Sequence, residues 1–336
     1  MKHYIKYFAL FFFAIGLIQC EKTTFVPEPG KDPEAIFEAL WTSFQNDYAG
    51  FDQRHVDWQE QYQRFRPQVN ANTTDDALAN TIESMLSTLD DGHVALIRPN
   101  RRVFYSNKIV NEEIDHELFN LELIKTHYLQ DVHSDYGGGI VYGKIGTLGY
   151  IHLKYIGLNL LGLDEALNYL DGVEGLIFDL RHNAGGDFTY AYSEFGRLTN
   201  QERFAHRSQT KNGTGPDDYT PWYDWNIYPK GKYFDKPIVL LTDRYTISAG
   251  ERMTMAFKAL PNVVHLGDTT NGAISTKILK ELPNGWVYSV ATQHIEFLDG
   301  KSYEGIGLIP DEVIRNTKEE VEAKVDHQLE VAIKRF

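Results

Sequence analysis

Residues 238–252 read IVLLTDRYTISAGER, an apolar run that passes through a polar turn to a serine. Ile238 to Thr242 have the length and composition of a buried strand. After the serine, Met253, Ala256 and Phe257 recur at helical spacing, which predicts an amphipathic helix. A buried strand joined to a helix by a short turn is the repeating unit of α/β folds.

Ser248 lies where this predicted strand meets the predicted helix. The first amide groups of a helix have no partner within the helix, so the serine hydroxyl would lie beside free N–H donors. This arrangement suits a nucleophile whose product oxyanion has to be held. The alternative is an ordinary serine N-cap, a common way for a helix to begin.

The chain of 336 residues divides into regions of different pattern. Residues 32–90 carry three apolar periodicities of helical spacing and predict a small N-terminal three-helix subdomain. Residues 91–336 predict one α/β core domain. Within it we expect short antiparallel strands over 99–145, a long loop over 201–235, and one final helix after the capping box at 317–320.

Residues 1–19 have the composition of a targeting segment, with Lys2 and Lys6 ahead of an apolar run. That run has about 12 residues, whereas a membrane-spanning helix needs roughly 20. The segment ends at Cys20 and resembles a bacterial lipoprotein signal, although Gln19 replaces the usual small residue. We therefore expect a protein that is lipid-anchored at Cys20 in the bacterial cell envelope, with 20–31 as a tether. Plain secretion is the alternative.

Composition excludes several classes of partner. The formal net charge of −14 argues against binding to nucleic acid or to an anionic membrane surface. Cys20 is the single cysteine, so no disulfide forms within the chain. The sequence contains no GKS or GKT phosphate loop, and no histidine pair at i, i+4 with a carboxylate between. It therefore predicts neither a cofactor nor a metal.

Three further segments have the residue types of a catalytic site: LDDGH at 89–93, DLRHNAGG at 179–186 and EGIGLIPD at 304–311. Together with TISAGE at 246–251, and in this order, they resemble the blocks of the tail-specific, or C-terminal processing, serine protease family. That family includes the tricorn core and retinoid-binding relatives. The resemblance covers roughly residues 33–315 and implies an α/β core of the ClpP/crotonase type and a serine peptidase acting on peptides or proteins.

The resemblance also implies roles for individual residues. Members of the family use either a lysine about 25 residues after the serine or a histidine and a glutamate. Ala273 stands where the lysine would be, and Lys277 is predicted to be a surface strand residue. The resemblance therefore implies Ser248 as nucleophile, His93 as base and Glu304 as the group that orients His93.

The chemistry of these residue types is consistent with those roles. A neutral serine needs a base whose pKa lies near 7, and an imidazole needs an acceptor on its second nitrogen. His93 could instead be a satisfied polar residue, and Glu304 a solvated carboxylate. One departure concerns Gly92, because the tricorn core has a serine directly before its histidine.

Backbone amides are expected to form the oxyanion hole. Ala249 follows the nucleophile, and Gly185 or Gly186 would supply the second N–H, since glycine allows close approach of the backbone. A strand-to-helix turn without function is the alternative for the glycine pair. Asp179 and Arg181 are expected to brace this turn by buried hydrogen bonds.

Two other functions stay open on the sequence alone. The chain could be a weak or inactive member that binds a hydrophobic ligand or peptide, because the catalytic lysine and the serine before His93 are both missing. A scaffolding role in an envelope uptake assembly is a third possibility. Residues 94–147 are too few for a PDZ domain, so we expect no PDZ-type capture of substrate C-termini.

Overall fold

The computed structural model describes residues 30–135 and 137–336. The predicted signal peptide, Cys20 and most of the tether lie outside the described residues. Among those that are described, no helix combines the length and the apolar character needed to cross a bilayer.

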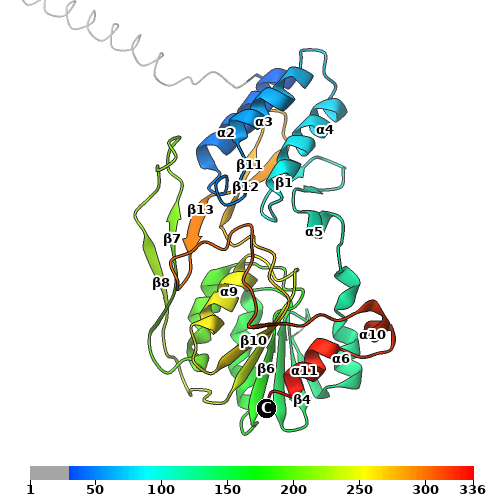
Figure 1. Cartoon of the computed structure of the whole chain (residues 1–336), viewed down its shortest axis with the longest axis vertical. Coiled ribbons are helices and arrows are strands. Elements are labelled where there is room, and N and C mark those ends of the chain that lie inside the picture. The colour runs from blue at the N-terminus through cyan, green and yellow to red at the C-terminus, as the bar shows by residue number, and fades with distance from the viewer. Residues whose placement is uncertain (1–29, 136) are drawn as a thin grey trace, which may run out of the picture.

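A seven-stranded mixed sheet forms the larger end of the molecule (Figure 1). Its order is β14-β10-β9-β6-β5-β4-β3, and the five strands from β14 to β5 are parallel, whereas β4 and β3 are antiparallel additions. The strands are β3 (Gln130–Ser134), β4 (Ile140–Ile145), β5 (Leu148–Leu153), β6 (Gly175–Asp179), β9 (Ile238–Thr242), β10 (Val263–Gly267) and β14 (Glu312–Val313).

Helices cover both faces of this sheet because its central strands are apolar on both sides. In β9, Ile238 and Leu240 pack into one hydrophobic cluster, and Val239 and Leu241 into another. The first cluster includes α7 (Leu163–Tyr169), α8 (Phe188–Glu194) and α9 (Ala249–Lys258), and the second includes α6 (Leu121–His127) and α11 (His327–Ile333). This arrangement confirms the predicted α/β class.

The N-terminal helices lie at the other end of the molecule (Figure 1). They are α2 (Pro33–Asp47), α3 (Trp58–Phe65) and α4 (Asp75–Leu86), which begin after the N-cap residues Asp32, Asp57 and Thr74. They share one core with a four-stranded antiparallel sheet of order β11-β12-β1-β2. The strands of that sheet are β1 (Ala95–Ile97), β2 (Phe104–Tyr105), β11 (Lys277–Glu281) and β12 (Val287–Ala291).

This shared core changes the division of the chain that the sequence suggested. The boundary predicted at residue 90 falls inside the N-terminal unit, because β1 follows it at once and β11 and β12 return from residues 277–291. Two strands almost 200 residues away along the chain thus complete the helical subdomain. Helical periodicity in 32–90 could not reveal that partner.

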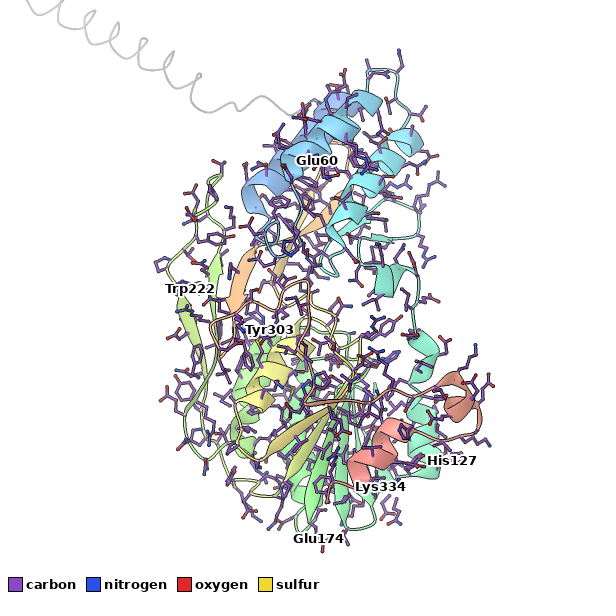
Figure 2. All side chains as sticks on the ribbon, viewed as in Figure 1. Glu60, His127, Glu174, Trp222, Tyr303 and Lys334 are labelled. Atoms are coloured by element: carbon purple, nitrogen blue, oxygen red, sulfur yellow. The ribbon has the colours of Figure 1, made fainter. Side chains whose placement is uncertain are left out.

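Two expectations for local structure were wrong. Residues 201–235 are not one long loop: β7 (Arg203–Thr210) and β8 (Tyr223–Ile227) form a hairpin with β13 (Gln293–Glu296) beside it. Figure 2 shows Trp222, just before β8, at the outer side of this sheet. Residues 99–145 contain α5 (Lys108–Asn111) and α6 as well as strands.

The last predicted helix is divided into two. The capping box at Thr317 and Glu320 is present and starts α10 (Lys318–Glu322). The chain then turns at Lys324, which has a φ of +63°, and Asp326 caps α11. Asp326 is held by a second contact that the local pattern does not show, namely a buried ion pair with Arg181.

Arg181 connects the end of β6 to this C-terminal helix. Its guanidinium donates to Asp179 at 2.6 Å, Asp326 at 2.8 Å and Gln328 at 2.8 Å, and its side chain has no exposed surface. Because a buried arginine is stable only with full pairing, the three acceptors fix the turn after β6 against α11.

Replacing Arg181 with methionine is expected to destabilise the fold by about 3–5 kcal/mol, because it leaves the buried Asp179 carboxylate without its cation. Chemical denaturation measures the change. Lys125→Met is the control: it breaks the exposed pair with Glu122 and should change the free energy of unfolding by less than about 1 kcal/mol. Equal effects of the two substitutions would contradict the role given to Arg181.

Candidate active site

Ser248 is held in an unusual backbone conformation at the start of α9. Its φ of +60° and ψ of −118° are rare for a residue with a side chain. The N–H of Ser248 donates to the carbonyl of Ala273 and to the carboxylate of Glu251, both at 3.0 Å. These bonds explain how the strained conformation persists, and they fix the direction of the Ser248 side chain.

The Gly185-Gly186 turn lies directly against Ser248. Both glycines have positive φ, +74° and +137°. A Cβ on Gly185 would lie 2.7 Å from the Ser248 Cβ, and one on Gly186 would lie 2.0 Å from the carbonyl oxygen of Ile156. A side chain at Gly185 would therefore push this turn away from Ser248, and one at Gly186 would push it away from the backbone of Ile156.

Only one of the two glycine amides can serve an oxyanion. The N–H of Gly185, one of the two glycines predicted as the second donor, already donates to Asn183 Oδ1 at 3.0 Å. The N–H groups of Gly186 and Ala249 donate to no other group of the described residues, and both residues line one cavity. Gly186 and Ala249 are therefore the pair available to an oxyanion.

This cavity has a volume of about 470 Å³, and we call it the Ser248 cavity. The lining residues that bear on chemistry are His93, Gly186, Phe188, Ser248, Ala249, Arg252 and Lys277. Ser248 and His93 thus face the same space although 155 positions separate them in the sequence. Within the described residues, no group of His, Cys, Asp or Glu side chains is arranged to hold a metal ion.

His93 is buried, with 2% of its surface exposed. Its backbone is fixed by an N–H bond to Asp91 Oδ1 at 2.7 Å and by a bond from Ser289 Oγ at 2.6 Å to its carbonyl. Neither ring nitrogen has a hydrogen-bond partner among the described residues, and none joins the ring to Ser248. Burial lowers the pKa of His93 to about 3, so the imidazole is neutral at physiological pH.

Glu304 is placed differently from the prediction. One carboxylate oxygen accepts from Arg54 Nη2 at 2.7 Å, and the other accepts from the N–H groups of Ile274 and Ser275 at 2.9 Å. Burial raises the pKa of Glu304, and Arg54 opposes this rise. The carboxylate makes no hydrogen bond to His93, because neither ring nitrogen of His93 has a partner among the described residues. That it orients His93 stays a prediction.

Arg54 is a site residue that the sequence did not reveal. Besides Glu304, it pairs with Asp91 at 3.3 Å and donates to the carbonyl of Gly272 at 2.7 Å. It thereby links Glu304 to the aspartate that holds the His93 backbone. Arg54 lies in a turn after α2, outside any recognisable motif and 250 positions from Glu304, so nothing in the local sequence marks it.

Glu251 is the second residue that sequence reasoning missed. Its buried carboxylate accepts four hydrogen bonds, from the Thr270 hydroxyl at 2.6 Å and from the N–H groups of Gly272 at 2.7 Å, Ala273 at 3.0 Å and Ser248 at 3.0 Å. Burial raises the pKa of Glu251 to about 7, and the hydrogen bonds oppose this rise. The signal was a glutamate at the third position of a helix after a serine, the capping-box pattern.

Comparison with known proteins identifies the family. The model of peptidase family S41 matches residues 147–314, half of the chain, and the model of the tricorn protease C1 domain matches residues 29–87. The chain belongs to peptidase family S41. This confirms the resemblance seen in the four sequence blocks, and it places the chain in a family of serine peptidases.

Individual relatives agree with this assignment. The chain is 29% identical to the tricorn protease of Thermoplasma volcanium over 56% of its own length and 17% of that protein. It is 27% identical to the carboxyl-terminal-processing protease of Synechocystis sp. over 56% of its own length and 43% of that protein. The chain therefore spans less than half the length of these curated relatives.

A solved structure is similar over almost the whole described chain. It is a putative peptidase from Parabacteroides merdae, 26% identical, with a TM-score of 0.82 over 91% of this chain and 97% of that one. The similarity includes the N-terminal helices as well as the α/β core.

The lysine used by some S41 peptidases has no counterpart here. Ala273 is completely buried, and its carbonyl accepts the N–H of Ser248. Lys277 does line the Ser248 cavity, but its side chain is exposed to solvent. A lysine base needs burial to lose its proton, so the surroundings of Lys277 favour the sequence interpretation of a solvated strand residue.

The structure also explains why a glycine, rather than a serine, precedes His93. A Cβ at this position would lie 2.5 Å from Ile247 Cδ1 and 3.0 Å from Ala273 Cβ. The space that a serine side chain would need before His93 is therefore filled by these two apolar side chains and by Asn271 Oδ1, which would lie 2.9 Å from the Cβ. This member of S41 has no room for a hydroxyl there that could contact the imidazole.

We expect the Glu251→Gln variant to lose part of the pH dependence of stability. The pKa of Glu251 is raised from 4.5 to about 7 in the folded chain, so its proton favours folding and this contribution is lost as pH rises through 7. The free energy of unfolding of the unmodified chain, minus that of the variant, should fall by about 3 kcal/mol between pH 4.5 and pH 8.

Urea denaturation at the two pH values measures this difference. Glu281→Gln removes an exposed carboxylate from β11 and serves as the control, with little pH-dependent change expected. A difference for Glu251→Gln that does not vary with pH would show that burial does not raise the pKa of this carboxyl.

Proposed function

We propose that this chain is a serine peptidase that cleaves peptide bonds through an acyl-enzyme on Ser248, with His93 as the base. One observation carries the proposal: Ser248, His93 and the amides of Gly186 and Ala249, which have no acceptor in the described part of the chain, line a single cavity. A nucleophile, a neutral base and two oxyanion donors are the parts that acyl transfer requires.

In the proposed reaction, Ser248 Oγ forms a bond to the carbonyl carbon while its proton moves to His93. The carbonyl oxygen becomes an oxyanion held by the N–H groups of Gly186 and Ala249. His93 then gives its proton to the leaving amine as the C–N bond breaks, and water releases the acyl group by the same steps. The hydrogen bond between Ser248 and His93 forms during this sequence, since catalytic hydrogen bonds often tighten only in the substrate complex.

Glu304 enters the proposal as a positioning residue. Its carboxylate fixes Arg54 and the backbone at Ile274 and Ser275, and Ser275 lines the Ser248 cavity. Arg54 in turn holds Asp91, which binds the His93 backbone. Glu304 therefore acts on His93 through Arg54 and Asp91.

A peptide is the substrate that the surroundings of Ser248 favour. Among the described strands, β11 pairs only with β12, so its other edge is open, and its first residue, Lys277, lines the cavity. An extended peptide can add to such an edge through its main chain. The lining also carries Arg252, Lys277 and Asp187, and these charged groups weigh against a site for a hydrophobic ligand.

The location of the peptidase is proposed from the sequence. We assign residues 1–19 as a lipoprotein signal and Cys20 as the lipidated N-terminus, so that the folded part is anchored in the cell envelope by its tether. These residues lie outside the described part of the chain. If the protein is anchored there, its substrates are peptides or proteins of the cell envelope.

Ser248→Ala is expected to abolish both peptide cleavage and labelling by a fluorophosphonate probe. His93→Ala should lower the labelling rate by at least about 100-fold, because a general base contributes roughly 10²–10⁴ to the rate. Lys301→Met, a change at an exposed residue, is the control and should leave both readouts as they are. Unchanged labelling of the Ser248→Ala variant would refute the assignment of the nucleophile.

Cys20→Ser is expected to release the protein from the membrane. Expressed in a bacterial host, the unmodified chain should incorporate radioactive palmitate and enter the detergent phase, whereas the variant should do neither. Ser248→Ala serves as a control that keeps Cys20. Detergent partitioning of the Cys20→Ser variant would indicate a different means of attachment.

A further inference from the structure

Arg252 lies one helical turn after Ser248 on α9 and lines the same cavity. Its side chain is almost completely buried, with 1% of the residue exposed. Ser248 and Arg252 therefore border the same space, in which the substrate would bind.

The charge of Arg252 has no counter-ion within the described residues. Its guanidinium donates to the carbonyl of Ile274 at 3.0 Å, the Thr276 hydroxyl at 3.0 Å and Gln293 Oε1 at 2.8 Å, and all three acceptors are neutral. Nη1 is buried and has no hydrogen-bond partner among the described residues. Burial lowers the pKa of Arg252 to about 10, which leaves it cationic at neutral pH.

An arrangement of this kind is unusual on energetic grounds. Buried charges in proteins are normally paired, because an unpaired buried cation costs several kcal/mol. The other buried arginines at functional positions follow this rule: Arg54 pairs with Asp91 and Glu304, and Arg181 with Asp179 and Asp326. Arg252 differs from both, and it is the one that lines the Ser248 cavity.

We propose that Arg252 binds a carboxylate of the substrate next to the scissile bond. This inference rests on the proposed peptidase function and adds a preference for anionic substrates. The carboxylate enters beside the Phe188 ring, which lies 4.0 Å from the guanidinium carbon and covers one face. A charge-assisted hydrogen bond to Nη1 then forms away from water, where such bonds are strongest.

The other charged groups of the cavity do not account for this preference. Lys277 and Asp187 are both exposed and of opposite sign, so water screens them and their fields partly cancel. Asp187 also accepts from the N–H and hydroxyl of Thr189 as the cap of α8. Arg252 is the buried cation of this cavity, and within the described residues it has no anionic partner.

Two groups of a peptide carry the required chemistry. One is the side chain of a glutamate or aspartate next to the scissile bond, and the other is the C-terminal carboxylate of a peptide that ends there. Both present two oxygens to a guanidinium. The experiment separates them by changing one group at a time.

The test measures binding to the Ser248→Ala protein, so it does not depend on turnover. The probes are fluorescein-labelled peptides of about ten residues with a neutral core, in which Glu is compared with Gln at each position and a free C-terminus with an amide. Fluorescence anisotropy gives the Kd of each member of a pair. At least one pair should favour the carboxylate about tenfold, and the effective pair identifies the source.

Arg252→Met in the Ser248→Ala background should bring this ratio close to one. Lys277→Met is the matched control from the same cavity, and it should preserve the ratio. A ratio near one in every pair with the Ser248→Ala protein overturns the proposal, whether or not the Arg252 variant folds. So does a ratio that survives Arg252→Met in a protein whose circular dichroism is unchanged.

Failure of the inference and failure of the proposed function give different results. If the unmodified chain cleaves peptides and reacts with the fluorophosphonate probe, but no pair shows a carboxylate preference, the carboxylate site is wrong and the peptidase stands. If the preference appears in binding but neither cleavage nor labelling occurs, the peptidase is wrong and the carboxylate site stands.

Discussion

The carboxylate of Glu251 holds together the segments that meet at Ser248. It receives the N–H of Ser248 from α9, and the Thr270 hydroxyl and the N–H groups of Gly272 and Ala273 from the segment after β10. A backbone at φ +60° is unfavourable for serine and persists only where its surroundings over-determine it. The four hydrogen bonds to the buried Glu251 carboxylate supply that constraint. The Gly185-Gly186 turn then packs directly against Ser248.

Ser248 and His93 come from different parts of the fold. Ser248 starts a helix that packs on the seven-stranded sheet, whereas His93 leads into β1, which belongs to the N-terminal unit (Figure 1). Their separation is therefore set by how these two units are held together. Figure 2 shows Tyr303, the neighbour of Glu304, between the two ends of the molecule.

Much of the fold and part of the site could be read from the sequence. Strands such as Ile238–Thr242 and the capping box at 317–320 depend on residues within a few positions, so local patterns revealed them. The three-stranded sheet around β7 and β8 was missed because β13, which pairs with β7, lies about 90 positions away. For the same reason the sequence named Ser248 and His93 but could not name Arg54, whose partners lie up to 250 positions from it.

The buried charges of the site fall into two kinds: those that are paired and maintain the structure, and the charge of Arg252, which we propose binds substrate. Arg54 is paired with both Asp91 and Glu304 around the backbone of His93, and Tyr48 donates a further hydrogen bond to Asp91 at 2.7 Å. Each charge in this group already has a partner of opposite sign, so a ligand would gain little by binding to it. Arg252 is equally buried but bonds only to neutral acceptors. Arg252 follows the nucleophile by one helical turn and lines the same cavity. An anionic group of a substrate bound there would supply the counter-ion that the guanidinium lacks among the described residues.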